Sequence, residues 1–309
     1  MAGPAVQARG LRKAYGSRVA VDGIDLDVRR GECFGFLGPN GAGKTTTMRM
    51  LACLSERDGG ELAVLGMDPD REPRELKARL GVVPQEVNLD LELSVLENML
   101  VYARYFGIKA APARERAMAL LRFVDLHERA EDTVVKLSGG MQRRLQIARA
   151  LVNDPEMILL DEPTTGLDPQ ARRMVWERLR DLRAGGTSVV ITTHYMDEAE
   201  RLCDRLVVID HGQVVREGAP AALVRDEVGA EVLEMRTAPS GAAMLAAATS
   251  PRHLVEGEIV MAFGDSAHDM RARADAARIP YEMVAERRAT LEDLFIVLTG
   301  HSLREDSPG

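Results

Sequence analysis

The pattern of hydrophobic and polar positions divides the chain into strand-rich and helix-rich stretches. Apolar and polar residues alternate strictly over residues 24–28, and with the short segments 6–8 and 18–21 they predict an antiparallel strand region over residues 6–32. Apolar runs predict further short or buried strands, and their ranges are 33–37, 59–66, 80–85, 157–160 and 188–193. Because helical segments such as 47–51 and 170–183 alternate with these strands, the pattern predicts an α/β core.

Residues 89–152 carry helical periodicity instead. Ser94 is followed three residues later by Glu97, which is a capping-box pattern. Apolar residues then recur at helical spacing, at Leu96, Met99, Leu100 and Ala103. A second helix fits residues 112–123, and a third starts after residues 138–140. We therefore expect a helical subdomain inserted in the α/β core.

A separate segment begins after residues 218–220. Residues 230–236, 258–263 and 280–284 predict strands with helices between them. A last helix carries apolar residues at positions i, i+3, i+4 and i+7, namely Leu291, Leu294, Phe295 and Leu298. Residues 302–309 are polar, and we expect them to fray. The pattern predicts a small α/β accessory domain or tail over residues 220–309, with no role that the sequence identifies.

The composition sets the size and excludes one class of partner. With 309 residues and 46% hydrophobic content, the chain can bury a sizeable core in about two domains. The net charge is -8, from 40 basic against 48 acidic residues, so we expect no nucleic acid as a partner. Cys33, Cys53 and Cys203 lack a C-x-x-C spacing, which indicates buried, reduced thiols in a cytosolic protein.

The hydropathy pattern also bears on membranes. No apolar run approaches the ~20 residues of a membrane span, and the N-terminus lacks the apolar core of a signal peptide. We therefore expect a soluble, cytoplasmic chain. If the chain serves a membrane process, another polypeptide must form the path through the membrane.

A glycine-rich segment connects the predicted strand 33–37 to the helical segment 47–51. Its G-x-x-x-x-G-K-T spacing lets successive backbone N–H groups surround a phosphate, because Gly41 and Gly43 can take backbone angles that a side chain would forbid. The candidate nucleotide-binding residues are Gly38, Pro39, Asn40, Gly41, Ala42, Gly43, Lys44, Thr45 and Thr46. A plain turn would need neither the lysine nor the hydroxyl, and a dinucleotide turn would need glycine where Thr46 stands. The segment is therefore a P-loop, but alone it does not choose among kinases, GTPases, helicases and transport ATPases.

Within this segment, Lys44 is placed to reach the β- and γ-phosphates, and the Thr45 hydroxyl can sit on Mg²⁺. Two carboxylates follow the run 157–160. Asp161 stands where Mg²⁺ needs a second protein contact, and Glu162 beside it is a candidate general base. This interpretation is favoured over a solvated acidic turn because a P-loop lies upstream.

Two other predicted strands also end at polar residues. The amide of Gln85 could help to coordinate Mg²⁺ or the attacking water, although a plain loop residue is equally consistent with the pattern. His194 follows the strand 188–193, where it could donate a hydrogen bond to a γ-phosphate. The remaining histidines are more simply surface or loop residues; they are His127, His211, His253, His268 and His301.

Two weaker signals remain. In the segment 137–141, LSGGM, Ser138 is a strong N-cap, and Gly139 and Gly140 expose backbone N–H groups at a helix N-terminus. This is a second anion site or an ordinary capped helix. Tyr15, in the first loop upstream of the P-loop, could stack on adenine or serve as a turn residue.

Seven features occur in one order along the chain: Tyr15, GPNGAGKTT (38–46), Gln85, LSGGM (137–141), MILLDE (157–162), GLDP (166–169) and His194. Over residues 6–219 this set resembles the nucleotide-binding domain of an ABC transporter. More narrowly, residues 88–92, 101–106 and 198–206 look like the ATPase subunits of nodulation-factor and daunorubicin-resistance exporters. Met141 departs from the glutamine of the general family signature, but it carries no assigned phosphate contact.

The resemblance implies a P-loop NTPase core of the ABC type, with an antiparallel β subdomain, an inserted helical subdomain, and ATP and Mg²⁺ as cofactors. It implies that Tyr15 stacks on adenine and that Glu162 is the base for hydrolysis. It also makes Gln85 the link between Mg²⁺ and a membrane partner, so the implied metal-side residues are Thr45, Gln85 and Asp161.

The resemblance further places Ser138 across a dimer interface, facing the P-loop of a second nucleotide-binding domain, with Asp168 in the contact between the halves. The cofactor-binding set therefore extends to Ser138, Gly139, Gly140 and Asp168. Because the chain holds one copy of each motif, the second copy must come from a homodimer or a close paralogue.

The sequence is interpreted as the ATP-hydrolysing subunit of an ABC exporter, held on the inner face of the membrane by a separate integral-membrane permease subunit. Residues 1–219 would form the nucleotide-binding domain and residues 220–309 the accessory domain. The alternative, a soluble ABC ATPase in translation or DNA repair, is disfavoured by the single motif set and the acidic balance. A nucleotide-binding protein without turnover is disfavoured by Glu162 and His194. The exported substrate is not readable from this chain, because the membrane subunit would contact it.

Overall fold

The computed structural model describes residues 3–299, and the chain divides between Val214 and Val215 into two compact units. The sequence analysis placed this division five residues later, at 219/220. The predicted fraying of residues 302–309 lies outside the described residues. Each unit is described by itself below.

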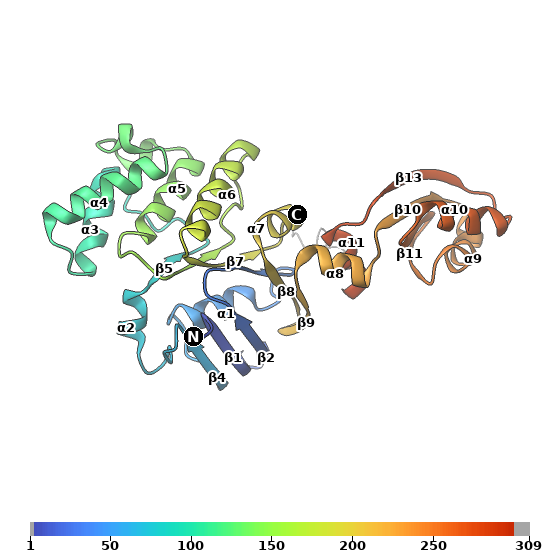
Figure 1. The fold of residues 1–309 in the computed structure, drawn as a ribbon, viewed down its shortest axis with the longest axis horizontal. Helices are drawn as coiled ribbons and strands as arrows, with labels where there is room; N and C mark the ends of the chain where they lie inside the picture. The colour runs from blue at the N-terminus through green and yellow to red at the C-terminus, as the bar shows by residue number, and fades with distance from the viewer. Residues whose placement is uncertain (1–2, 300–309) are drawn as a thin grey trace. The chain divides into compact units, whose positions relative to one another are not determined.

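The first unit opens with an antiparallel sheet of order β2-β1-β4, formed by β1 (Val6–Tyr15), β2 (Arg18–Val28) and β4 (Gly59–Val64). These strands lie side by side in Figure 1. β1 and β2 are longer than predicted, and Tyr15 ends β1 opposite Arg18 instead of lying in a loop. The prediction missed this because the register shifts between Ala8 and Leu11, and an irregularity of this kind interrupts the alternation of side chains.

The central sheet has six strands in the order β5-β6-β7-β3-β8-β9. Their bounds are β5 Leu80–Val83, β6 Met157–Asp161, β7 Ser188–Thr193, β3 Cys33–Leu37, β8 Arg205–Asp210 and β9 Gln213–Gly218. The four pairs from β5 to β8 are parallel, so these strands end at one edge of the sheet. The predicted strands 33–37, 157–160 and 188–193 are confirmed, whereas β8 and β9 were not assigned from the pattern.

Four helices accompany this sheet: α1 (Lys44–Leu51), α2 (Pro73–Ala78), α6 (Pro169–Ala184) and α7 (Met196–Leu202). α1 begins at Lys44, three residues before the predicted start, because Gly43 takes the left-handed conformation and ends the loop. A shared core joins the antiparallel sheet to the central sheet; it includes Val6, Leu26, Phe34, Phe36, Met50 and Leu159. Cys33 and Cys203 are buried free thiols, as predicted, but Cys53 is only half-buried.

The predicted helical subdomain is confirmed and consists of α3 (Val95–Tyr105), α4 (Ala110–Phe123) and α5 (Gly139–Ala150), with 3-10 turns at His127–Arg129 and Val134–Lys136. The three helices gather together in Figure 1. The capping box of α3 is also confirmed, because Ser94 accepts from the N–H of Glu97 and the Glu97 carboxylate accepts from the N–H of Ser94. The subdomain has its own core, which includes Val95, Met99, Ala117, Leu121, Val134 and Leu145.

The second unit contains a four-stranded antiparallel sheet of order β11-β12-β10-β13. Its elements are α8 (Pro220–Glu227), β10 (Glu231–Arg236), α9 (Pro239–Thr249), β11 (Arg252–Glu256), β12 (Ile259–Gly264), α10 (Ala267–Ala276), β13 (Glu282–Arg288) and α11 (Leu291–Thr299). The βαββαβ succession from β10 to β13 is a ferredoxin-like arrangement. The analysis of the pattern missed β11, whose residues Arg252 and His253 are exposed and polar. The predicted last helix is confirmed.

Candidate functional site

The segment after β3 forms a tight loop that only glycine allows at two positions. Gly41 and Gly43 have φ values of 82° and 106°, in the left-handed region that favours glycine. A Cβ on Gly43 would lie 2.4 Å from the carbonyl oxygen of Ala20. The loop leads directly into α1, so backbone N–H groups at the N-terminus of this helix are available to an anion.

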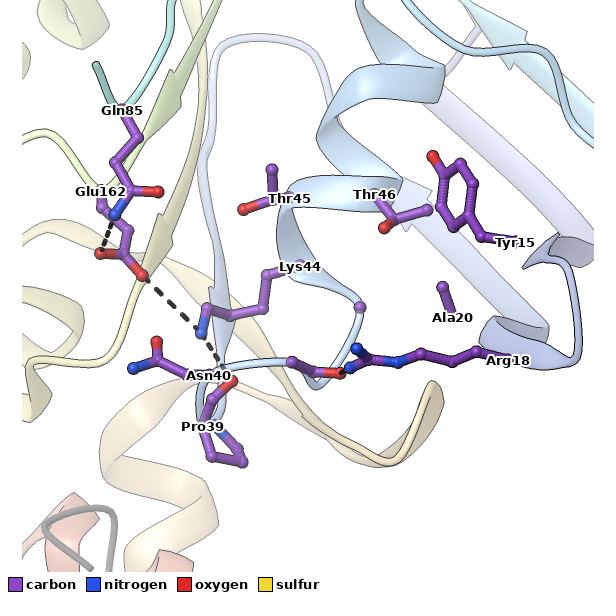
Figure 2. Close-up of a pocket in the computed structure, with 12 residues that line it drawn as sticks. Tyr15, Arg18, Ala20, Pro39, Asn40, Lys44, Thr45, Thr46, Gln85 and Glu162 are labelled. Atoms are coloured by element: carbon purple, nitrogen blue, oxygen red, sulfur yellow. Dashed lines mark hydrogen bonds and ion pairs between the residues drawn. The ribbon is translucent and has the colours of Figure 1, made fainter. Parts of the chain in front are cut away.

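Lys44, the first residue of α1, is buried, and its side chain turns back over the loop. Its Nζ donates to the carbonyl oxygens of Gly38, at 2.6 Å, and Pro39, at 2.9 Å. It also lies 3.9 Å from the Oε1 atom of Glu162 (Figure 2). Burial lowers the pKa of Lys44, and the charges of Glu162 and Asp161 oppose that shift. The Lys44 side chain therefore lies at the junction of the loop and β6, between the loop carbonyls and the Glu162 carboxylate.

Asp161 ends β6 beside the start of α1. Its Oδ1 atom accepts a hydrogen bond from the Thr45 hydroxyl at 3.2 Å and another from the Thr192 hydroxyl of β7. Residues far apart in sequence thus bring a hydroxyl and a carboxylate together. Oxygen donors of this kind suit Mg²⁺, which in nucleotide sites is usually held by one or two protein ligands together with phosphate.

Glu162 follows Asp161, and its carboxylate contacts several of the residues proposed from the sequence. Oε2 accepts from the Gln85 amide at 3.2 Å and from the Thr165 hydroxyl at 3.1 Å. Oε1 lies 3.3 Å from Nδ1 of His194, an ion-pair distance without hydrogen-bond alignment. Burial raises the pKa of Glu162, but the nearby His194, followed by Lys44 and Thr165, outweighs burial and leaves the pKa below its usual value. The carboxylate therefore stays ionised at neutral pH.

The backbone of Glu162 is unusual as well. Its φ is 46°, in the left-handed region that non-glycine residues rarely adopt. Its N–H donates to the hydroxyl of Thr192 at 2.9 Å. Such conformations persist only where surrounding contacts enforce them, and they concentrate at functional sites.

A pocket of about 370 Å³ lies over the loop. Its lining comprises Tyr15, Arg18, Ala20, Pro39, Asn40, Gly41, Gly43, Lys44, Thr45, Thr46, Gln85 and Glu162. Figure 2 shows Tyr15 and Glu162 on opposite sides of this pocket, with Lys44 between them. Tyr15 is 49% exposed, which leaves its ring accessible.

Arg18 and Ala20 line the pocket but were not singled out from the sequence. Arg18 pairs with Tyr15 across the β1–β2 turn, and its guanidinium donates to the carbonyl oxygen of Gly41 at 3.3 Å. The signal that could have found both residues is their strand register, because a hairpin that places Tyr15 at the pocket also places the start of β2 there.

Six of the predicted binding residues are not in the lining of this pocket. Two of them, Gly38 and Ala42, belong to the loop beneath it, and the other four are Ser138, Gly139, Gly140 and Asp168. Ser138 caps α5, and its hydroxyl oxygen accepts from the N–H of Met141 at 3.3 Å. Asp168 caps α6 and accepts from the N–H groups of Gln170 and Ala171, both at 2.9 Å. The two caps belong to helices that touch, because a Cβ on Gly140 would lie 2.8 Å from the Cβ of Ala171. Within one chain, these two helix N-termini thus form a separate group.

The structure also bears on metals and membranes. Among residues 3–299, no three His, Cys, Asp or Glu side chains come together as a metal site. No helix in this part of the chain has the length and apolarity needed to cross a membrane.

Comparisons with known proteins give consistent results. The family description "ABC transporter" matches residues 21–165. The Nod factor export ATP-binding protein I of Paraburkholderia xenovorans (strain LB400) is 46% identical over 304 residues, covering 97% of this chain and 99% of the relative. The protein of the same name from Ralstonia nicotianae (strain ATCC BAA-1114 / GMI1000) is 44% identical over 307 residues, covering 98% of this chain and 96% of the relative.

Solved structures resemble the chain as well. The dimeric structure of a post-hydrolysis state of an ATP-binding cassette bound to ADP and Pi has a TM-score of 0.64 and 30% identity, and the match covers 69% of this chain and 98% of that one. The ADP conformation of another ABC transporter cassette has a TM-score of 0.64 and 27% identity, covering 70% of this chain and 91% of that one.

Proposed function

This chain belongs to the ATP-binding proteins of ABC transporters, and from that premise we propose how its site works and what it assembles with. It is the ATP-binding and ATP-hydrolysing subunit of an ABC exporter. The soluble alternative in translation or DNA repair is not favoured, because the relatives that match nearly the whole chain are export ATP-binding proteins. It works as a dimer with a membrane subunit.

The observation that carries the proposed mechanism is the position of the Glu162 carboxylate. It is ionised, and it lies 3.9 Å from the Lys44 ammonium and 3.3 Å from the His194 ring. We assign Glu162 as the general base, because a carboxylate next to the phosphate loop can accept the proton of the attacking water. The water oxygen then bonds to the γ-phosphorus while the bond from that phosphorus to the bridging oxygen breaks, and ADP leaves with that oxygen. Lys44 and His194 would stabilise the negative charge that develops on the phosphoryl oxygens.

The other side chains of the pocket bind and orient ATP. The loop amides and Lys44 hold the phosphates, and the exposed ring of Tyr15 offers a face for adenine. Thr45, Asp161 and Gln85 would hold Mg²⁺, which neutralises phosphate charge when bound. The hydrogen bond from Thr45 to Asp161 supports this assignment, because it brings two oxygen ligands together at the start of α1.

We propose further that the dimer is a homodimer and that each hydrolytic site is shared. Ser138, Gly139 and Gly140 would face the phosphate loop of the second subunit, with Asp168 in the contact between the two halves. The separation of Ser138, Gly139 and Gly140 from the pocket within one chain supports this proposal, because the N-terminus of α5 suits an anion and would need a phosphate from another chain.

Residues 1–219 act as the nucleotide-binding domain in this proposal, and residues 220–309 as an accessory domain. The chain would be cytoplasmic, held at the inner face of the membrane by the permease subunit, with no nucleic acid as a partner. The exposed residues Leu91 and Tyr105, at 48% and 79%, support a docking surface on the helical subdomain. We assign the choice of cargo to the membrane subunit.

The test is purification of the tagged chain from detergent-solubilised membranes, with identification of the bound polypeptide and measurement of ATP hydrolysis. A co-purifying integral-membrane protein and ATP turnover are expected. Lys44→Ala is the matched control, because it should remain bound to the membrane protein while losing turnover. Recovery of the chain with ribosomes or DNA, and not with a membrane protein, would contradict the proposal.

A further inference from the structure

Arg143, on α5, is a buried cation that the site description above does not use. It is 5% exposed, and all three of its guanidinium nitrogens donate to main-chain carbonyl oxygens. The acceptors are Pro84 at 2.5 Å, Gln85 at 3.3 Å, Asp161 at 2.8 Å, Glu162 at 3.0 Å and Pro163 at 2.9 Å. One side chain therefore joins the segment after β5 to the segment after β6.

These two segments carry Gln85 and Glu162. The φ of Glu162 is 46°, a backbone conformation that is unfavourable for glutamate. It persists only if neighbouring groups hold the peptide groups on both sides of the residue. Thr192 accepts from the Glu162 N–H on one side of the residue, and Arg143 donates to the Glu162 carbonyl on the other. The backbone that aims the carboxylate is thus fixed at both ends.

Arg143 is accompanied by two other side chains on the same helix. Gln146 donates to the carbonyl oxygen of Glu86 at 2.9 Å, and Arg149 donates to that of Asn88 at 2.8 Å. Residues three apart on a helix share a face, so α5 presents a row of donors to the segment that follows β5. Only Arg143 in this row also reaches the segment of Glu162.

We propose that Arg143 is a positioning residue for ATP hydrolysis, which holds the backbone of Gln85 and Glu162 so that the Glu162 carboxylate meets the attacking water. This inference rests on the proposed role of Glu162 as general base. An arginine suits the task because its planar fork places donors on three nitrogens, whereas lysine carries all its donors on a single nitrogen. A displacement of a catalytic group by about 1 Å can cost on the order of 10²-fold in rate.

The chain offers a matched control in the next residue. Arg144 is also buried, at 8% exposed, and donates to the carbonyl oxygen of Val124 within the helical subdomain. Arg144→Met therefore removes a buried guanidinium from the same helix without touching the segments of Gln85 and Glu162. The experiment compares Arg143→Met, Arg143→Lys and Arg144→Met in the full chain, measuring the melting temperature, the affinity for ATP, kcat and KM.

Arg143→Met is expected to lower kcat by about 10- to 100-fold while KM and the affinity for ATP change less than about threefold, because Lys44 and the loop amides still hold the phosphates. Arg143→Lys should give an intermediate kcat. Arg144→Met should keep kcat within about threefold of the wild type, even if it lowers the melting temperature as much as Arg143→Met does.

A double-mutant cycle separates positioning from a general loss of structure. If Arg143 acts through Glu162, adding Arg143→Met to Glu162→Gln should slow single-turnover hydrolysis by less than about threefold more. Equal kcat for Arg143→Met and Arg144→Met, or fully additive effects with Glu162→Gln, would overturn the proposal. If Arg143→Met does not fold, Arg143→Lys with wild-type kcat would overturn it as well. Full turnover by Glu162→Gln alone would instead refute the proposed general base, which keeps the two failures distinct.

Discussion

The most direct prediction concerns Glu162→Gln, which removes one negative charge and leaves the size of the side chain almost unchanged. The amide oxygen can still accept hydrogen bonds, but the NH₂ group must replace one carboxylate oxygen. It then faces either the two donors Gln85 and Thr165 or the cation Lys44. It can no longer take a proton from water at neutral pH.

The expected magnitude follows from the role lost. Loss of a positioned general base typically lowers the rate by ~10²–10⁴, which corresponds to about 2.7–5.4 kcal/mol in the activation free energy. Binding of ATP should change little, because the substitution leaves the Gly43 turn and the hydrogen bond from Lys44 to the Gly38 carbonyl in place. In the proposed site these groups would hold the phosphates. ATP should consequently accumulate in the mutant and trap a dimer.

Phosphate release under saturating ATP measures the first effect, and light scattering after size-exclusion chromatography, with and without ATP, measures the second. Glu32→Gln provides a control for the substitution itself, because Glu32 is exposed to the same 7% as Glu162 but pairs with Arg205. Glu32 lies just before the first residue of β3, whereas the phosphate loop follows the last residue of that strand. Glu32 is therefore at the opposite end of β3 from the loop. The control should therefore lose stability and retain kcat.

Two results would refute the reasoning. Turnover by Glu162→Gln within about threefold of the wild type would remove Glu162 from the mechanism. An equal loss of kcat in Glu32→Gln would mean that any change at a buried glutamate disturbs the enzyme, and the rate loss would then say nothing about proton transfer.

Three further predictions concern the partners and the fold. Mixing Lys44→Ala and Ser138→Arg chains should partly restore hydrolysis relative to either mutant alone, because a mixed dimer holds one intact shared site; absence of recovery in proven mixed dimers, with no requirement for two working sites, would contradict a site completed in trans. A charge at Leu91 or Tyr105 should leave folding and ATP binding intact but abolish recruitment to membranes, and a variant that still co-purifies with the membrane subunit at the wild-type ratio would place docking elsewhere. A hydrogen-bonded arginine lowers the pKa of Asp68 to about 2, so its ion pair stabilises the fold above the unfolded pKa near 4 and is lost as pH falls towards 2. Asp68→Asn should accordingly cost about 1–2 kcal/mol at pH 7 by urea unfolding, and a difference from the wild type that stays constant down to pH 2 would be inconsistent with this account.

Several parts of the molecule follow from the sequence alone, because their causes are local. The loop after β3 requires glycine at Gly41 and Gly43 whatever surrounds it. The capping box of α3 needs only Ser94 and Glu97 at the right spacing. The buried strand β7 has the predicted bounds, because each of its six residues is buried and apolar or hydroxylated. The sequence also determined the family, through the order of its motifs.

The tertiary structure decided what depends on residues distant in the chain. The 3.9 Å separation of Lys44 and Glu162 exists because β3 and β6 end at the same edge of a parallel sheet, and no spacing in the sequence encodes it. Tyr15 belongs to a strand and not to a loop, since an irregular register breaks the alternation that periodicity relies on. In the sequence, Arg143 cannot be distinguished from the other arginines of its helix. Only the fold places the carbonyl groups of two strand ends around its side chain. Its contacts are made with the backbone, whose direction depends on φ and ψ and not on residue type, and this is the physical reason that the sequence alone could not reveal them.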